Sequence, residues 1–139
     1  MKRVYTAEVT ATGGRTGHVK SNDGILDMPV RLPEGLGGNG GATNPEQLFA
    51  AGYAACFQSA LMLVASKQKI RLDEKSTVTA HVGLDQFENA GYGLSVQLDV
   101  KIDGVDKEKA MELVEQAHQV CPYSVGTRGN IDVQLNVLN

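Results

Sequence analysis

One segment near the middle of the chain, residues 44–67, constrains the fold more than any other. Asn44 can cap a helix, Pro45 suits the first helical position, and the Glu46 carboxylate is favoured at the positive end of a helix. Gln47, three residues after Asn44, completes the pattern of a capping box. The sequence therefore predicts a long helix that begins here and runs to about Lys67.

The predicted helix is apolar along most of its length, and it is thin. Five residues at helical spacing share one face: Phe49, Tyr53, Cys56, Ala60 and Val64. Alanine and glycine occupy residues 50–52 and 54–55, which lets a neighbouring backbone pack closely. The pattern predicts that Cys56 lies mid-helix on an apolar face, away from bulk water. We also predict that the apolar stretch 48–64, interrupted by Gln58 and Ser59, is too short and too mixed to span a bilayer.

The remainder of the chain reads as strands and a second helix. Alternating apolar residues predict strands over residues 3–10, 15–20, 28–32, 75–87, 92–102 and 129–138. Asp106 can cap a helix that ends near Val120, because Pro122 disfavours helical geometry at Cys121. The order of elements predicts an α+β fold with mainly antiparallel pairing. The glycine-rich loop over residues 33–42 is predicted to be a functional loop or a subunit crossover, with a flexible linker as the alternative.

Size and charge exclude several classes of protein. A chain of 139 residues favours a single domain over residues 1–139. The net charge of −3 offers no basic footprint for nucleic acid and no polybasic anchor for a membrane. The N-terminus lacks an apolar signal core, so we expect the protein to be cytoplasmic.

The two cysteines, Cys56 and Cys121, carry the candidate chemistry. Reducing systems in the cytoplasm favour a catalytic or redox pair over a structural disulfide, although two buried, inert cysteines are the alternative. The tetrapeptide that begins at Cys121 is a weak glutaredoxin-like signal, and we reject it because a helix rather than a strand precedes it and only fifteen residues follow Ser124. No metal site is expected, because the three histidines are scattered. The loop 35–41 lacks the lysine of a P-loop, which argues against a nucleotide.

Arg15 is a second candidate, although an arginine between glycines is usually a solvated turn residue. A guanidinium favours the thiolate form of a nearby cysteine and can stabilise a leaving alkoxide. An arginine in an apolar pocket needs a carboxylate partner to offset desolvation. Glu46 is the candidate partner, and its alternative role is to interact with the helix N-terminus.

Three motifs together resemble a known family over nearly the whole chain. They are Ala11-Thr12-Gly13-Gly14-Arg15, the segment 41–57, and Cys121-Pro122-Tyr123-Ser124 with Arg128-Gly129-Asn130. The chain resembles the organic hydroperoxide resistance proteins, the Ohr branch of the Ohr/OsmC thiol peroxidases. The resemblance implies an OsmC-like fold with antiparallel sheets packed around two helices. It also implies an intertwined homodimer with two sites at the subunit interface.

The resemblance further implies a thiol peroxidase that reduces alkyl and fatty-acid hydroperoxides to alcohols in oxidative stress defence. Cys56 matches the peroxidatic cysteine, Cys121 the resolving cysteine, and Arg15 and Glu46 the active-site arginine and glutamate. The implied reductant is dihydrolipoamide or a lipoylated protein, with no metal, haem or flavin. In this mechanism Cys56 becomes a sulfenic acid, condenses with Cys121 to a disulfide, and is released by dithiol exchange.

The residues around Cys56 suit an alkyl tail better than hydrogen peroxide. Phe49, Tyr53 and Phe57 are predicted to bind substrate, and each buried methylene of a tail contributes about 0.8 kcal/mol. An OsmC-branch peroxidase with a different substrate range remains an alternative. A non-catalytic lipid-binding or redox-sensing protein, or an inert structural domain, is another.

Helix geometry constrains how the candidates meet. Glu46 and Cys56 are ten positions apart, which is about 15 Å along one helix. They cannot touch within one chain if both lie on that helix. If Arg15 bridges them, Arg15 and Glu46 must come from one subunit and Cys56 from the other.

Overall fold

The computed structural model of the chain describes residues 1–139 and contains six strands, three α-helices and two short 3-10 helices. The N-terminal part holds β1 (Val9–Thr12), η1 (Gly14–Thr16), β2 (His18–Ser21), β3 (Asp27–Pro29) and η2 (Glu34–Leu36). It is followed by α1 (Pro45–Lys67), β4 (Thr77–Gln86), β5 (Tyr92–Lys101), α2 (Lys107–Val120), α3 (Pro122–Thr127) and β6 (Val133–Val137). The α+β class is confirmed. The chain divides into two units, residues 1–48 and 49–139, which are described in turn.

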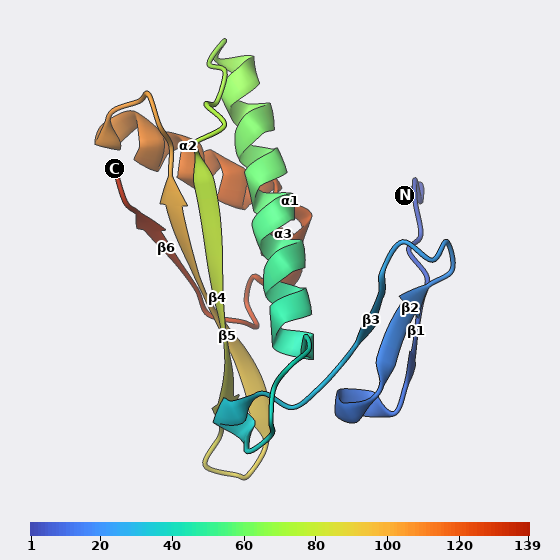
Figure 1. Cartoon of the computed structure of the whole chain (residues 1–139). Helices are drawn as coiled ribbons and strands as arrows, with labels where there is room; N and C mark the ends of the chain where they lie inside the picture. The colour runs from blue at the N-terminus through green and yellow to red at the C-terminus, as the bar shows by residue number, and fades with distance from the viewer. The chain divides into compact units, whose positions relative to one another are not determined.

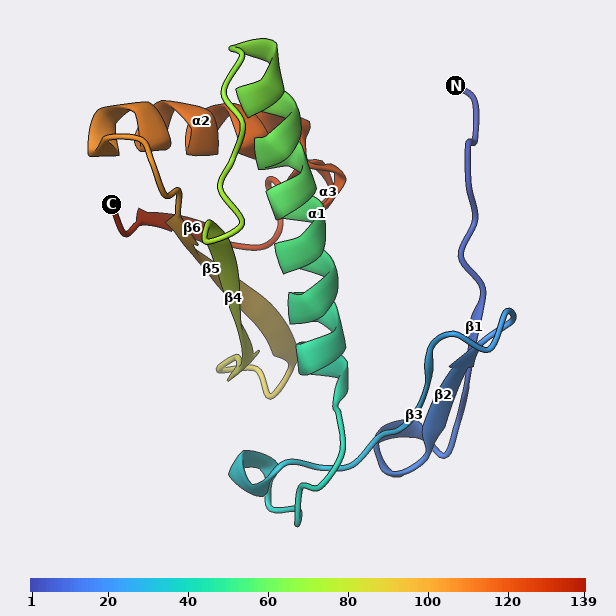
Figure 2. The same ribbon diagram turned by 45° about the horizontal axis from the view of Figure 1, so that its top comes forward.

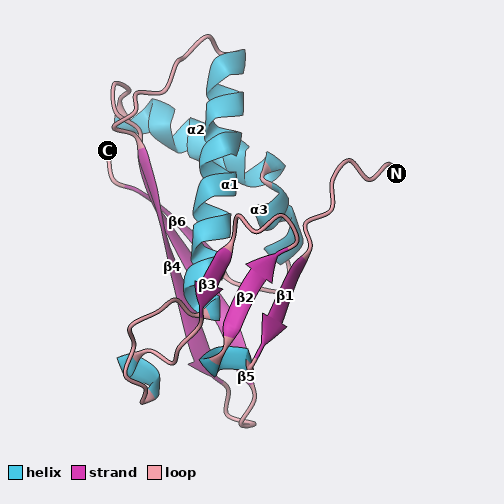
Figure 3. Cartoon of the chain, turned by 45° about the vertical axis from the view of Figure 1, so that its right-hand side comes forward, coloured by secondary structure: helices cyan, strands magenta, loops and turns pink.

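The first unit is a three-stranded antiparallel sheet in the order β1-β2-β3 (Figure 3). The predicted strand over residues 3–10 is wrong in position, because strand pairing begins only at Val9. The predicted strand over residues 15–20 also begins too early, because η1 occupies Gly14–Thr16. Val30 is the one hydrophobic residue of this unit that is buried, so the sheet has no core of its own. A sheet of this size without a buried face is marginal in water.

The glycine-rich loop of the first unit is folded rather than a flexible linker. The η2 turn ends at Gly37, which has a φ of 85°. The Gly40 amide then bonds the Leu32 carbonyl at 2.9 Å. The loop returns to the sheet edge through a parallel bridge between Val30 and Thr43. These contacts fix the approach of the chain to the first turn of α1.

The second unit is a three-stranded sheet, β4-β5-β6, covered on one face by helices. Strands β4 and β5 form a long antiparallel hairpin, as predicted. Strand β6 pairs with β5 in parallel, with Val96 opposite Val133, so this second sheet is mixed rather than purely antiparallel. Helix α2 crosses α1 steeply (Figure 1 and Figure 2), and both contribute to the core with the inward residues of β5.

Helix α1 begins and ends where the sequence predicts. The Asn44 side chain accepts a hydrogen bond from the Gln47 amide at 2.9 Å, which confirms the cap. The capping box is not completed, because the Gln47 side chain accepts instead from the Thr43 hydroxyl at 3.0 Å.

The prediction that this apolar segment is too short to span a bilayer is wrong, because the 23 residues of α1 are long and apolar enough to do so. This is weak evidence, because one face of α1 packs in the core of the second unit, and core helices pass the same test.

The C-terminal helical region differs from the prediction in one respect. Asp106 caps α2 by accepting from the Lys109 amide at 2.8 Å, and α2 ends at Val120 as predicted. Cys121 is extended, as Pro122 predicts, but a further helix that was not predicted begins directly after it. Pro122 occupies the first turn of this six-residue helix, α3, where its missing amide hydrogen costs nothing.

Candidate functional site

Arg15 and Glu46 form a bidentate ion pair within the first unit. The Arg15 Nη1 and Nη2 atoms donate to the two Glu46 carboxylate oxygens at 2.9 and 2.7 Å. The Arg15 side chain is 40% exposed and the Glu46 side chain 14% exposed. The predicted partnership of these two residues is therefore present in the structure. A paired fork of this kind fixes the plane of the guanidinium as well as its position.

The turn that carries Arg15 depends on glycine. Gly13 and Gly14 both adopt positive φ, 71° and 54°, which glycine tolerates at little cost. Gly17 is needed for a different reason: a Cβ there would lie 1.7 Å from the Thr12 carbonyl oxygen. These glycines allow the chain to turn tightly between β1 and β2 and to present Arg15 from η1.

A set of backbone contacts brings the start of α1 to this turn. The Val30 amide bonds the Gly17 carbonyl at 2.9 Å, and the Arg31 amide bonds the Thr43 carbonyl at 2.9 Å. The Arg31 side chain also donates to the carbonyls of Thr16 and Gly17. Glu46, three residues beyond Thr43, is thus held near Arg15 by contacts that lie entirely in residues 1–48.

The ion pair shifts the titration of both partners. Hydrogen bonds from Arg15 hold the pKa of the Glu46 carboxyl below its usual range. The hydrogen bonds to Glu46 raise the pKa of Arg15 in turn. The pair therefore stays charged throughout the neutral range.

Cys56 and Cys121 are free thiols that interact within the second unit. Cys56 projects from α1 and is half-buried, whereas Cys121, between α2 and α3, has no exposed surface. We predicted that Cys56 lies away from bulk water, but its side chain is only half-buried. The cysteine that is excluded from solvent is Cys121.

The pKa of the Cys56 thiol is raised above its ordinary value. Burial is the largest cause, and the neighbouring Cys121 adds to it, while a hydrogen bond from the Tyr123 backbone amide acts in the opposite direction. None of these influences is a cation. A nearby cation would lower the pKa of this thiol and favour the nucleophilic thiolate.

The predicted substrate-binding residues differ in their access to solvent. Tyr53 and Phe57 are fully buried, so these two side chains of α1 face the core rather than an open wall that substrate could reach. Phe49 is only partly buried. Sequence reasoning missed Tyr123, whose ring centroid lies 6.0 Å from that of Phe49 and 5.5 Å from that of Tyr53. The only signal for it was its place in the motif that begins at Cys121.

The absence of a side chain at Gly52 leaves room for the Tyr123 ring against α1. A Cβ at Gly52 would lie 2.4 Å from the Tyr123 hydroxyl oxygen, so a larger residue would push the ring away from α1. The thinness of α1 predicted from its small residues therefore has a specific use. It allows the segment after Cys121 to lie close to the helix that carries Cys56.

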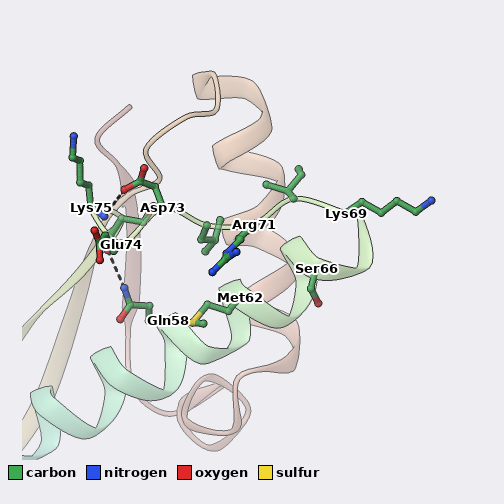
Figure 4. A pocket seen from close by; sticks show the side chains of 11 residues that line it. Gln58, Met62, Ser66, Lys69, Arg71, Asp73, Glu74 and Lys75 are labelled. Carbon is green, nitrogen blue, oxygen red and sulfur yellow. Dashed lines mark hydrogen bonds between the residues drawn. The ribbon is translucent and has the colours of Figure 1, made fainter.

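A cavity of about 1050 Å³ lies elsewhere in the second unit, between α1 and residues 69–76 (Figure 4). Met62 and Arg71 are among its lining residues, and the Gln58 side chain donates across it to the Ser76 carbonyl at 2.9 Å. Neither cysteine lines it, so it is separate from the candidate chemistry. No group of three or more His, Cys, Asp or Glu side chains is arranged to hold a metal ion.

Comparison with known proteins places these features in a family. The model of the OsmC-like protein family matches residues 37–136. The organic hydroperoxide resistance protein of Xanthomonas axonopodis pv. citri is 50% identical over 137 residues, covering 98% of this chain and 96% of the relative.

Solved structures agree with the sequence comparison. The crystal structure of an organic hydroperoxide resistance protein from Elizabethkingia anophelis, with thiocyanate bound, is 58% identical. It aligns with a TM-score of 0.92 over 100% of this chain and 99% of that one. The crystal structure of OhrB from Bacillus subtilis is 49% identical and aligns with a TM-score of 0.87 over 96% and 98% of the two chains. The chain therefore belongs to the OsmC-like family, in its organic hydroperoxide resistance branch.

Proposed function

We propose that the protein is a cysteine-based peroxidase that reduces organic hydroperoxides to alcohols and so protects the cell from oxidative stress. The observation that carries the proposal is the pair of free, interacting thiols, one half-exposed on a helix and one buried beside it. The relatives named for organic hydroperoxide resistance support the same substrate class. Alkyl and fatty-acid hydroperoxides fit best, because the surroundings of Cys56 are apolar.

The proposed cycle has three balanced steps. The Cys56 thiolate attacks the distal oxygen of the peroxide, the O–O bond breaks, and the alkoxide takes up a proton to leave as an alcohol. The resulting sulfenic acid condenses with the Cys121 thiol, which forms the disulfide and releases water. A dithiol of the lipoyl class then reduces this disulfide by exchange and is itself oxidised to a cyclic disulfide.

Arg15 is the proposed activator of Cys56, and we propose that it comes from a second copy of the chain. Glu46 and Cys56 both lie on α1, ten residues apart, which is about 15 Å of helical rise. The ion pair with Glu46 orients Arg15, so the guanidinium can serve Cys56 of the other subunit. The raised pKa of Cys56 within one chain is consistent with a cation that arrives with a partner.

Uncovered apolar surface supports such a homodimer. Val4 and Tyr5 of the first unit are 88% and 77% exposed, and Met62 on α1, beside the cavity of the second unit, is 58% exposed. A helix that is apolar on all sides is normally covered on all sides. A second copy is the proposed cover, and the cytoplasm the proposed location.

The first experiment is steady-state turnover of an alkyl hydroperoxide with dihydrolipoamide as reductant. Fast turnover is expected, with little when hydrogen peroxide replaces the substrate or glutathione replaces the reductant. Comparable rates on both peroxides would favour an OsmC-branch enzyme of different range. Disulfide formation or ligand binding without turnover would instead indicate a sensor or a lipid-binding protein, and the proposal would be wrong.

A complementation experiment tests the shared site. Cys56→Ser and Arg15→Gln proteins are each expected to be inactive, and the two are then produced together in one cell. If each site uses both subunits, a mixed dimer has one intact site, which restores about a quarter of the wild-type sites in a random mixture. Absence of any recovery in verified mixed dimers would place each site within a single chain.

A further inference from the structure

A chain of three polar side chains, two of them fully buried and one partly buried, joins the three helices of the second unit. The Ser124 hydroxyl of α3 lies 2.8 Å from the Tyr53 hydroxyl of α1 and 2.9 Å from Nδ1 of His118 on α2. Tyr53 and Ser124 have no exposed surface. These three residues, called here the hydroxyl chain, play no part in the chemistry proposed above.

Ser124 is the junction of the hydroxyl chain. A hydroxyl can donate one hydrogen bond and accept two, and this one has a partner on each side. Burial is the main cause that lowers the pKa of His118, so its neutral imidazole can accept the Ser124 proton while Ser124 accepts that of Tyr53. Thr127 closes the group, because its hydroxyl donates to the Ser124 carbonyl at 3.2 Å. No buried side-chain polar atom is left without a partner.

Helix α3 depends on such contacts for its position. It has only six residues, and isolated helices of that length are not stable in water. Besides Ser124, the Arg128 guanidinium ties its far end to α2 by donating to the His118 carbonyl at 2.6 Å. The Tyr53 hydroxyl links α1, the helix that carries Cys56, to α3 through Ser124 at 2.8 Å and, more weakly, through Thr127 at 3.4 Å.

The two groups that contact the Cys56 sulfur, the Cys121 thiol and the Tyr123 amide, lie directly before α3 and within it. The Tyr123 amide donates toward this sulfur. The Cys121 carbonyl accepts from the Val125 amide of α3 at 2.9 Å, and the Cys121 amide donates to the Ala117 carbonyl of α2 at 2.8 Å, so the position of Cys121 depends on how α3 is held against α2. A shift of α3 would therefore move the resolving sulfur relative to the peroxidatic sulfur.

We propose that Ser124 is a positioning residue for the resolving step, acting through the hydroxyl chain to hold Cys121 at Cys56. The proposal rests on the proposed function. In this step the Cys121 sulfur attacks the Cys56 sulfenic sulfur, the S–O bond breaks, and the thiol proton leaves with the hydroxyl as water. A disulfide forms only within a narrow range of Cβ separations, about 3.5–4.5 Å, whereas attack on a diffusing peroxide has no such requirement on Cys121.

The test separates the two steps in a single turnover with one equivalent of an alkyl hydroperoxide. Sulfenic acid is trapped at timed intervals with a cyclic diketone and measured by mass spectrometry, and disulfide formation is followed as loss of both free thiols. In Ser124→Ala we expect disulfide formation to slow on the order of tenfold or more, because misplacement of a reacting group is costly. Sulfenic acid formation should change by less than about threefold, so sulfenic acid accumulates.

Two further variants make the result specific. Tyr53→Phe keeps the buried ring and removes one link of the hydroxyl chain, and it should slow the same step in the same direction. It also decides the matter if Ser124→Ala does not fold. Ser76→Ala is the matched control: Ser76 is equally a buried serine, its hydroxyl accepts from the Asp103 amide at 3.0 Å, and it lies outside the hydroxyl chain. Its disulfide should form at the wild-type rate.

The outcomes distinguish the two proposals. If the wild-type protein forms no sulfenic acid, the proposed function fails and the role of Ser124 fails with it. If the wild-type protein completes its cycle, and the Ser124→Ala and Tyr53→Phe proteins form the disulfide as fast as Ser76→Ala, the positioning role alone is overturned.

Discussion

The ion pair between Arg15 and Glu46 can be separated experimentally from the interaction of Glu46 with the helix N-terminus. Surface ion pairs contribute about 0.2–1 kcal/mol, and the bidentate geometry places this one at the upper end. Because Arg15 is 40% exposed, solvent screening keeps the expected coupling to about 1 kcal/mol. The helix N-terminus adds about 0.3–1 kcal/mol to the contribution of Glu46 alone.

These magnitudes define a double-mutant cycle. Arg15→Gln should lower the free energy of unfolding by about 1 kcal/mol and Glu46→Gln by about 1.5 kcal/mol. The double variant should lose no more than Glu46→Gln alone, because both substitutions remove the same pair. Denaturant unfolding at one fixed protein concentration, followed by circular dichroism, measures all four proteins.

The pH dependence of the cycle follows from the sign of the Glu46 shift. The pKa of Glu46 is lowered in the folded protein, so the coupling is fully present above the ordinary value of 4.5. It is lost as the pH falls through the lowered, folded-state pKa. Zero coupling at neutral pH, with Glu46→Gln still destabilising, would show that Glu46 acts only on the helix and would refute the reasoning.

Three shorter predictions concern other parts of the structure. Gly17→Ala should disrupt the Arg15 turn and lower the melting temperature followed by circular dichroism, because its Cβ would clash with backbone; Gly35→Ala, where space is open and φ is not positive, is the control. Asp106→Ala should lower the free energy of unfolding by about 1 kcal/mol through loss of the α2 cap, as measured by denaturant titration. The pKa of the Cys56 thiol, measured from the pH dependence of alkylation in Cys121→Ser, should rise when Arg15→Gln is added. An unchanged value would argue against Arg15 as the activator.

The parts of the fold that were predicted correctly are those governed by local signals. Both caps, at Asn44 and Asp106, come from side chains that bond amides three residues away, so their geometry is written in short segments. The β4-β5 hairpin follows from alternation across a single turn. The parallel position of β6 was not predictable in this way, because its pairing with β5 depends on the path of the intervening helices.

In the candidate site, too, the residues with a local sequence signal were predicted and those that depend on distant contacts were not. The cysteines and the arginine could be picked out because their chemistry is unusual in such settings, and the Glu46 partnership followed from the cost of an unpaired charge. Ser124 and His118 carried no comparable signal, because their roles depend on Tyr53, which lies 71 positions from Ser124 in sequence. Tyr53 itself was assigned to substrate, since spacing shows which residues share a face but not what covers that face.

The unequal exposure of Cys56 and Cys121 determines which sulfur of the proposed disulfide a reductant can attack. Because Cys121 has no exposed surface, an incoming dithiol can approach the proposed disulfide only at the Cys56 sulfur. The transient mixed disulfide with the reductant is then carried on α1, and Cys121 is the leaving group. The same burial would shield Cys121 from overoxidation, so the half-buried Cys56 sulfur is where excess peroxide would inactivate the protein.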